Sequence, residues 1–135
     1  MNLPKMELME GRARPFPLSR AALLDALFAR ALADCRRAVE GIEAGDVAGK
    51  SEAIRHALDI VETLGLALDY SVAPELCAQL ETLYVYVEDC LVAGNRHVDA
   101  TQVRRAMGVL KVLRDAFAEA ARDLSSTGQD QQGQP

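Results

Sequence analysis

Two long amphipathic stretches of this sequence are separated by only two residues, Gly45 and Asp46. Glycine suits the left-handed backbone conformation that commonly ends a helix, and aspartate is a good N-terminal cap for the helix that follows. Because a connection this short cannot let two long helices diverge, they must lie antiparallel and side by side. The sequence therefore predicts a helical hairpin over residues 19–71.

Apolar residues recur at three- and four-residue spacing in four segments of the chain, which indicates four amphipathic helices. Ser19, Asp46 and Asp99 are suitable caps for three of them, and the remaining helix opens just after Pro74. The predicted helices cover residues 19–45, 46–71, 75–95 and 99–124. No segment shows the alternating pattern of a β-strand. The predicted fold class is all-α, an antiparallel up-down four-helix bundle with short turns.

The two ends of the chain differ in composition from the predicted bundle. Residues 1–18 contain Pro4, Pro15 and Pro17 and apolar residues without sustained periodicity, so we expect a flexible N-terminal arm. Residues 125–135 are rich in Ser, Gly and Gln and have no apolar side chain to offset the entropy of ordering, so we expect a disordered tail. The 135 residues suffice for one core, and residues 19–124 form the predicted single domain.

Charge and cysteine content narrow the class of protein and its partners. Lys and Arg total 15 against 20 Asp and Glu, for a net charge of −5, and the acidic residues are scattered through the predicted helices. Nucleic-acid binders need basic residues concentrated on one face, so nucleic acid is not an expected partner. No stretch is apolar enough to span a membrane, and Cys35, Cys77 and Cys90 lie in or beside apolar stripes, as free thiols do. We therefore expect a cytoplasmic protein that does not insert into a membrane.

Motifs for catalysis or metal binding are scarce. The sequence has no glycine-rich phosphate loop, nucleophile elbow or paired-cysteine metal motif, so we expect no catalytic residue, metal or cofactor. His56-Ala57-Leu58, followed by Gly65, is similar to the motif of histidine phosphotransfer domains, which are also four-helix bundles. Asp59 and Ile60 stand where that motif has Lys and Gly, and a carboxylate there repels a phosphoryl group. A phosphotransfer module using His56 is one alternative function.

The helices carry more apolar residues than a minimal four-helix core requires. Tyr84 and Tyr86 are two positions apart, about 200° around a helix, so only one of them can follow the core stripe closely. The spacing favours Tyr84 at the border of the core and Tyr86 further out. Contiguous exposed apolar surface on an acidic protein usually marks a partner site, and dimerisation or cover by residues 1–18 is the competing explanation. A client-free bundle that dimerises through this surface is a second alternative function.

Several motifs, in the same order along the chain, resemble those of the FliS-type flagellin export chaperones. The run Leu80-Glu81-Thr82-Leu83-Tyr84-Val85-Tyr86-Val87, followed by Leu91 and Asn95, is similar to their third helix with its Leu-Tyr-x-Tyr core. Residues 109–120 resemble their fourth helix, residues 19–28 their first, and Gly45-Asp46 their first turn. Phe28 and Phe117 replace a Tyr and a Trp, which exchanges aromatic for aromatic. The resemblance covers residues 19–121.

The resemblance implies a cytoplasmic chaperone, monomer or homodimer, without catalytic activity. Such chaperones bind the C-terminal helical region of flagellin, prevent premature filament assembly and deliver the subunit to the flagellar type III export apparatus. We expect amphipathic helices of the client to fold into apolar grooves between the bundle helices, with the N-terminal arm covering part of that surface when no client is present. The residues that we expect to contribute to partner binding are Leu23, Phe28, Ile60, Leu64, Tyr84, Tyr86 and Met107.

Overall fold

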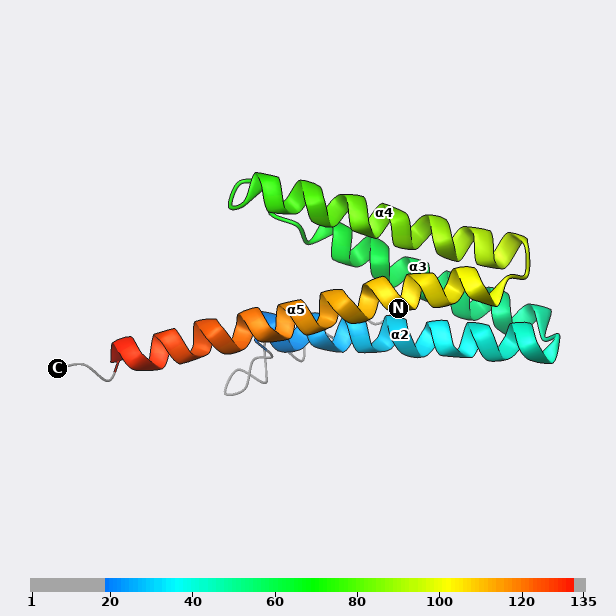
Figure 1. Cartoon of the computed structure of the whole chain (residues 1–135), viewed down its shortest axis with the longest axis horizontal. Helices are drawn as coiled ribbons and strands as arrows, with labels where there is room; N and C mark the ends of the chain where they lie inside the picture. Colours follow the sequence, from blue (N-terminus) through cyan, green and yellow to red (C-terminus); the bar gives the residue numbers. More distant parts are fainter. Residues whose placement is uncertain (1–18, 133–135) are drawn as a thin grey trace, which may run out of the picture.

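The fold is an all-α bundle of four antiparallel helices, which confirms the predicted fold class (Figure 1). The computed structural model describes the backbone of residues 19–132 and the side chains of residues 19–124, and the predicted arm, residues 1–18, lies outside the described residues. The helices are α2 (Arg20–Ala44), α3 (Val47–Leu66), α4 (Pro74–Arg96) and α5 (Ala100–Gln132). Each helix packs against the next and α5 packs against α2, so the four form a closed ring around one core. None of these described helices is long and apolar enough to cross a membrane.

The turn at Gly45 and Asp46 closes the hairpin of α2 and α3. Gly45 has a φ of 72°, in the left-handed region that glycine tolerates, and the Asp46 N–H donates to the Gly41 carbonyl over 2.8 Å. The Asp46 carboxylate then caps α3 by accepting from the Gly49 N–H at 2.9 Å. A β-carbon at Gly41 would lie 2.9 Å from the Lys50 backbone nitrogen. Glycine at that position therefore lets the two helices approach closely next to the turn.

Two other predicted caps are confirmed, but α3 ends earlier than the sequence predicts. The Ser19 hydroxyl accepts a hydrogen bond from a backbone N–H in the first turn of α2, and the Asp99 carboxylate does the same for α5. α3 ends at Leu66 rather than at residue 71. In the connecting loop the Asp69 carboxylate accepts hydrogen bonds from the backbone and side chain of Ser71. These local bonds compete with the helix and stabilise a turn instead.

The ends of α4 and α5 also differ from the prediction. α4 continues past Gly94 to Arg96, and the turn lies at residues 97–99. A β-carbon at Gly94 would lie 2.7 Å from Val103 Cγ2, so this glycine permits close packing against α5 rather than forming a turn. α5 runs on to Gln132, whereas the sequence predicts its end near Leu124 and a disordered tail after it. Adding residues to an existing helix avoids the cost of nucleation, so this polar segment can stay helical without an apolar stripe.

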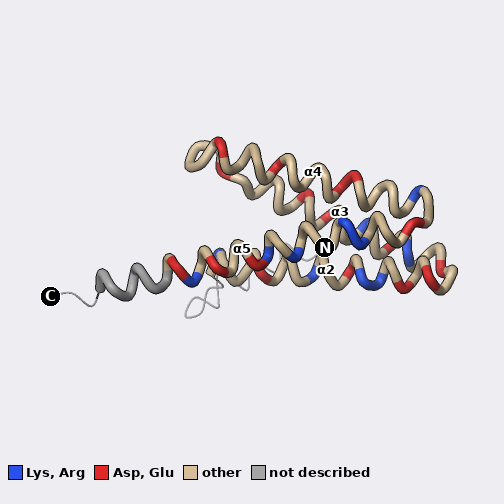
Figure 2. Tube along the Cα trace, viewed as in Figure 1, with Lys and Arg blue, Asp and Glu red and all other residues tan. Residues whose placement is uncertain are grey.

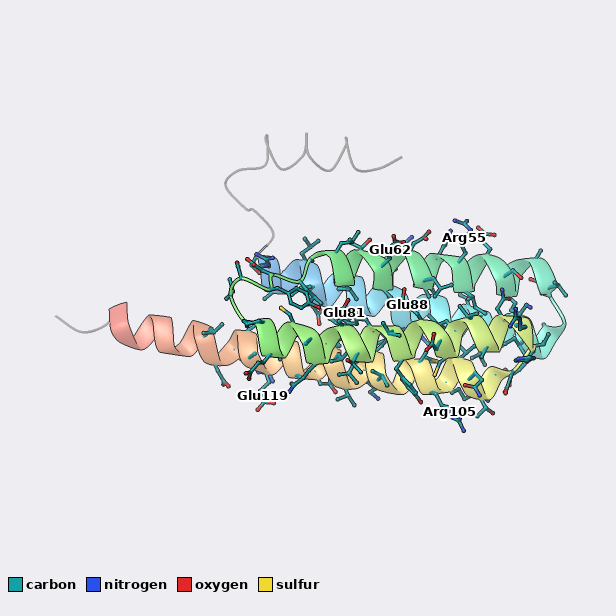
Figure 3. The ribbon with its side chains drawn as sticks, turned by 90° about the horizontal axis from the view of Figure 1, so that it is seen from above. Arg55, Glu62, Glu81, Glu88, Arg105 and Glu119 are labelled. Carbon is teal, nitrogen blue, oxygen red and sulfur yellow. The ribbon has the colours of Figure 1, made fainter. Side chains whose placement is uncertain are left out.

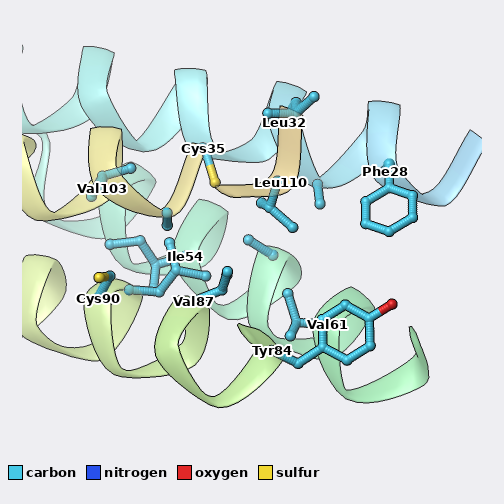
Figure 4. Close-up of a cluster of buried hydrophobic side chains, with 14 of the residues drawn as sticks. Phe28, Leu32, Cys35, Ile54, Val61, Tyr84, Val87, Cys90, Val103 and Leu110 are labelled. Atoms are coloured by element: carbon cyan, nitrogen blue, oxygen red, sulfur yellow. The ribbon is translucent and has the colours of Figure 1, made fainter. Parts of the chain in front are cut away.

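The core is mainly aliphatic and lies between all four helices. Figure 4 shows Phe28, Cys35, Ile54, Val87 and Leu110 directed into this shared interior, and all five are buried. The three cysteines are buried free thiols, as predicted, and burial raises the pKa of Cys35 to about 12. These cysteines therefore pack as small apolar residues.

Side-chain links join α2 to α5 along much of their common length. The Arg114 guanidinium forms a bidentate pair with Asp25 at 2.9 and 3.2 Å, and Arg104 pairs with Glu43 at 3.2 Å. The rings of Phe28 and Phe117 stack with their centroids 5.6 Å apart. In Figure 1 the hairpin of α3 and α4 diverges from α2 and α5 toward the end at which α2 begins. The bundle is thus two helix pairs that are splayed at one end.

Candidate functional site

An open apolar groove of 400 Å³ runs between α4 and α5, and we call it the α4/α5 groove. Its α4 side carries Leu83 and Tyr86, which are 38% and 45% exposed, and its α5 side carries Val112, which is 67% exposed. Large apolar side chains with this much exposure, gathered along one groove, form a surface that a partner would cover. The groove is lined by Leu83, Tyr86, Arg105, Gly108, Val109, Val112 and Leu113.

The chemistry of the α4/α5 groove suits an apolar helix face. Arg105 is its only charged lining residue among the described side chains. A hydrogen bond with the Cys90 thiol raises the pKa of the Tyr86 phenol. Gly108 lies in the middle of α5, and a β-carbon there would meet nothing within 4 Å. Packing inside this chain therefore gives no reason for a glycine that weakens the helix, whereas a partner backbone that approaches closely would need one.

A second apolar hollow of 260 Å³ lies at the splayed end of the bundle, where all four helices contribute to its lining. Leu24 and Phe117 reach it from α2 and α5, and Leu64, Leu80 and Tyr84 reach it from α3 and α4. All five side chains are also part of the core or are packed against it. The hollow is therefore an opening into the core, and it lies next to the start of α2.

Three of the seven predicted partner-binding residues are core residues. Phe28, Leu64 and Tyr84 are at most 3% exposed, and burial raises the pKa of Tyr84 to about 12. Tyr84 and Tyr86 do divide as their spacing predicts, with Tyr84 inward and Tyr86 outward, but Tyr84 lies further inside than the border of the core. The three side chains are the large apolar groups that fill the bundle, so a partner reaches them only where a hollow opens onto the core.

The other four predicted residues do not form one surface. Leu23, Ile60 and Met107 are half-buried, and Met107 lines a separate hollow between α2 and α5 together with Arg36 and Arg104. Tyr86 alone of the seven lines the α4/α5 groove. Each of the four lies on a different helix, and Tyr86 and Met107 line different hollows.

The sequence reasoning also missed part of the groove. Leu76 and Leu83 stand four and three residues from the buried Leu80, a spacing typical of one helix face, yet they are 53% and 38% exposed, and Leu83 lines the groove. They lie seven residues apart on the flank of the buried stripe, whereas Leu80, Val87 and Leu91 follow its centre and are buried. Because residues seven positions apart lie on nearly the same side of a helix, Leu76 and Leu83 define a helix face roughly 40° or more away from the centre of the buried stripe. This offset is the sequence signal that identifies them as surface residues. Gly108 carries no such signal, because an isolated glycine in a helix has several structural uses.

His56, the candidate phosphotransfer residue, lies among charged groups on α2 and α3. Its Nδ1 is 3.4 Å from Arg37 Nη2, and its Nε2 is 4.0 Å from a Glu52 oxygen. Arg37 in turn pairs with the buried Asp34 at 2.7 Å. The histidine therefore takes part in a polar link between two helices. Among the described residues, no group of three or more His, Cys, Asp or Glu side chains could hold a metal ion.

An antiparallel bundle with open apolar grooves between its helices is typical of helical proteins that bind a segment of another protein. The family model described as Flagellar protein FliS matches residues 17–124 of this chain. The chain is also similar to the Flagellar secretion chaperone FliS of Salmonella typhimurium, with 31% identity over 104 residues that cover 76% of this chain and 77% of that protein. The chain therefore belongs to the FliS family. This membership confirms the expected family and supports a non-enzymatic protein over a phosphotransfer module.

Proposed function

We propose that this protein is a cytoplasmic flagellar secretion chaperone whose client is the C-terminal helical region of flagellin, held in the α4/α5 groove. The observation that supports the location is the set of exposed apolar residues that line that groove, Leu83 and Tyr86 from α4 and Val112 from α5. Membership of the FliS family supports the class of client. The delivery of the bound client to the type III export apparatus is part of the same proposal.

The proposed mechanism is burial of an assembly surface. A flagellin segment that is disordered before assembly folds as an amphipathic helix when its apolar face enters the groove. The same face would otherwise pair with other flagellin subunits, so the bound client cannot polymerise. Tyr86 supplies a large, partly exposed ring to the contact, and loss of such an aromatic anchor typically costs about 2 kcal/mol or more of binding free energy.

The groove assignment is tested with two glycine substitutions that have opposite expectations. Gly108→Leu places a side chain in the α4/α5 groove, and since a β-carbon there meets nothing within 4 Å, the variant should fold normally. Gly65→Leu is the matched control, because Gly65 is also helical, also meets nothing within 4 Å, and lines the neighbouring groove between α3 and α4. Both variants are compared with the parent protein by far-UV circular dichroism before binding is measured.

Titration calorimetry with a flagellin C-terminal peptide gives the result. Gly108→Leu should weaken binding at least ten-fold, equivalent to about 1.4 kcal/mol, and Gly65→Leu should leave it unchanged. Normal binding by Gly108→Leu would overturn the location of the site. Light scattering of the parent protein with full-length flagellin should show a 1:1 complex, whereas a client-free dimer would be unaffected by the addition.

A further inference from the structure

A second groove, between α3 and α4, differs from the α4/α5 groove in its charge. It has a volume of 220 Å³ and an apolar floor, in which Val61 and Tyr84 are buried at 1% and 3% exposure. Gly65 leaves an open space at its α3 side, and Leu66 and Val85 flank it at 80% and 48% exposure. The apolar flanks of this α3/α4 groove are therefore exposed to solvent on both helices, above a floor of core residues.

The rim of the α3/α4 groove is formed by glutamates from both helices. Figure 3 shows Glu81 and Glu88 of α4 directed into the space between the two helices, with Glu62 of α3 along the same stretch. Arg55 and Arg105, labelled in the same view, lie away from this stretch, and Arg55 pairs with Asp59 on its own helix at 3.6 Å. The rim is thus acidic over about two helical turns, the span from position 81 to 88.

The acidic rim belongs to a longer region that has no basic residue. Between Arg55 and Arg96 the sequence contains no Lys or Arg, although acidic residues occur there as they do elsewhere in the chain. Figure 2 shows the consequence on α4, where acidic positions follow the helix and a basic one occurs only at its C-terminal end. Among residues 19–124, the Lys and Arg side chains are therefore unevenly distributed, because they occur only on α2, the first half of α3, the end of α4 and α5.

The electrostatics of Glu88 agree with this arrangement. Partial burial, followed by the nearby charges of Glu62 and Asp89, raises the pKa of the Glu88 carboxyl. Glu81 has a neutral partner, since it accepts a hydrogen bond from the Tyr70 hydroxyl in the loop before α4. Like charges held around an apolar floor, without a neighbouring cation in the sequence, repel one another, and a bound cation would relieve that repulsion.

We propose that the α3/α4 groove binds a cationic amphipathic helix of a partner protein, one whose narrow apolar face is bordered on both sides by Lys or Arg. The apolar face covers Leu66, Val85 and the open space at Gly65, and the flanking cations pair with Glu62 on one rim and with Glu81 and Glu88 on the other. This proposal concerns a different groove from the flagellin site and does not depend on it. An anionic or neutral helix would meet the same floor but would leave the glutamate repulsion unrelieved.

The probe is a designed peptide of about 14 residues, long enough for the two-turn rim, with a Leu and Ala stripe and Lys on both flanks. A matched peptide carries Glu at every Lys position. We expect the full-length protein to bind the Lys peptide, with an affinity that falls as salt is raised from about 10 mM to 0.5 M, and to bind the Glu peptide at least ten-fold more weakly. Equal binding of the two peptides would overturn the proposal.

Two variants locate the site. Gly65→Leu fills the groove and should abolish binding of the Lys peptide, whereas Gly108→Leu should leave it intact. The double substitution Glu62→Gln and Glu88→Gln should weaken it roughly three- to ten-fold at low salt, the effect of losing two partly exposed ion pairs. Glu75→Gln with Glu119→Gln removes the same charge from exposed positions outside the groove and should have little effect.

The outcomes separate this proposal from the flagellin site. If the control pair weakens binding as much as Glu62→Gln with Glu88→Gln, the attraction is due to net charge alone and the proposed site is wrong. If Gly108→Leu rather than Gly65→Leu abolishes binding of the Lys peptide, the cationic helix binds in the α4/α5 groove, which also refutes the proposal. Loss of flagellin binding in Gly108→Leu tests only the flagellin site, whatever the Lys peptide does.

Discussion

Gly41 is the position at which a single methyl group should disturb the bundle most directly. In the Gly41→Ala variant the new β-carbon would lie 2.9 Å from the Lys50 backbone nitrogen and 3.1 Å from its Cα and Cβ. Favourable contacts between carbon atoms occur at about 3.5–4.0 Å, so α2 and α3 must move apart by roughly half an ångström or more. Movement is resisted on both sides, because the Asp46 N–H is bonded to the Gly41 carbonyl and the Lys50 amino group donates to the Asn95 carbonyl of α4.

The expected loss of stability follows from two opposing effects. Overpacking of this kind typically costs about 1–3 kcal/mol, and replacing glycine with alanine in a helix returns up to about 1 kcal/mol. The net effect is a loss of about 1–2 kcal/mol. For a domain of this size that loss lowers Tm by roughly 5–10 °C.

Urea unfolding followed by circular dichroism measures the effect, with Gly108→Ala as the matched control. Gly108 is helical and its β-carbon would meet nothing within 4 Å, so this variant should gain about 0.5–1 kcal/mol from helix propensity alone. Relative to the parent protein, Gly41→Ala should lower the free energy of unfolding and Gly108→Ala should raise it, so the two variants should differ from each other by about 2 kcal/mol. If Gly41→Ala is stabilised as much as Gly108→Ala, the close approach of α2 and α3 at this turn is not what requires glycine.

Three further predictions concern single side chains. Tyr84→Ala should cost about 3–5 kcal/mol of folding free energy because it empties a core site. Tyr86→Ala should cost less than about 1 kcal/mol of stability and should instead weaken binding of the flagellin peptide. Equal losses of stability in the two variants would contradict the placement of Tyr84 in the core and Tyr86 on the surface. The ion pair with Arg114 lowers the pKa of Asp25, so its contribution to stability is complete above the ordinary carboxyl pKa of 3.8 and is lost as pH falls through the lowered value. Asp25→Asn should accordingly destabilise the protein at pH 6 but not at the acid end of a pH series of unfolding curves, and a difference that persists in acid would refute this linkage. Burial of Cys35, Cys77 and Cys90 predicts that iodoacetamide labels none of them at pH 8 until the protein is unfolded, as mass spectrometry can show; rapid labelling of Cys35, whose pKa is raised to about 12, would mean that the core opens readily.

The two grooves explain how one small bundle can offer distinct surfaces. α4 belongs to both grooves, because its core stripe faces inward between two exposed flanks. Leu83 and Tyr86 lie on the flank toward α5, and Val85 and Glu88 lie on the flank toward α3. A client in one groove therefore leaves the other open. A cationic helix could bind there while flagellin is held, which is the arrangement that handover to a further protein would require.

The sequence by itself determined which segments are helical and how they connect. Periodic apolar residues define α2 to α5, and the two-residue turn at Gly45 makes the first hairpin antiparallel, because helix periodicity and turn chemistry are local properties. The order of motifs was also sufficient to indicate the FliS family. Boundaries such as the end of α4 were less accurate, since Gly94 serves packing against Val103 rather than the turn that a glycine commonly marks.

The tertiary structure alone decided which apolar residues are core and which are surface. Phe28, Leu64 and Tyr84 occupy the interior, whereas Leu83 and Tyr86 line a groove, although all five are large apolar residues on amphipathic helices. A stripe in the sequence gives the direction of a helix face, but the neighbouring helices determine how wide a part of that face they cover. In this ring of four helices α2 is linked to α5, and the hairpin of α3 and α4 diverges from them at one end. The four helices therefore cover the centre of each apolar stripe and expose its flanks. The candidate binding surfaces lie on those flanks because no helix of this bundle packs against them.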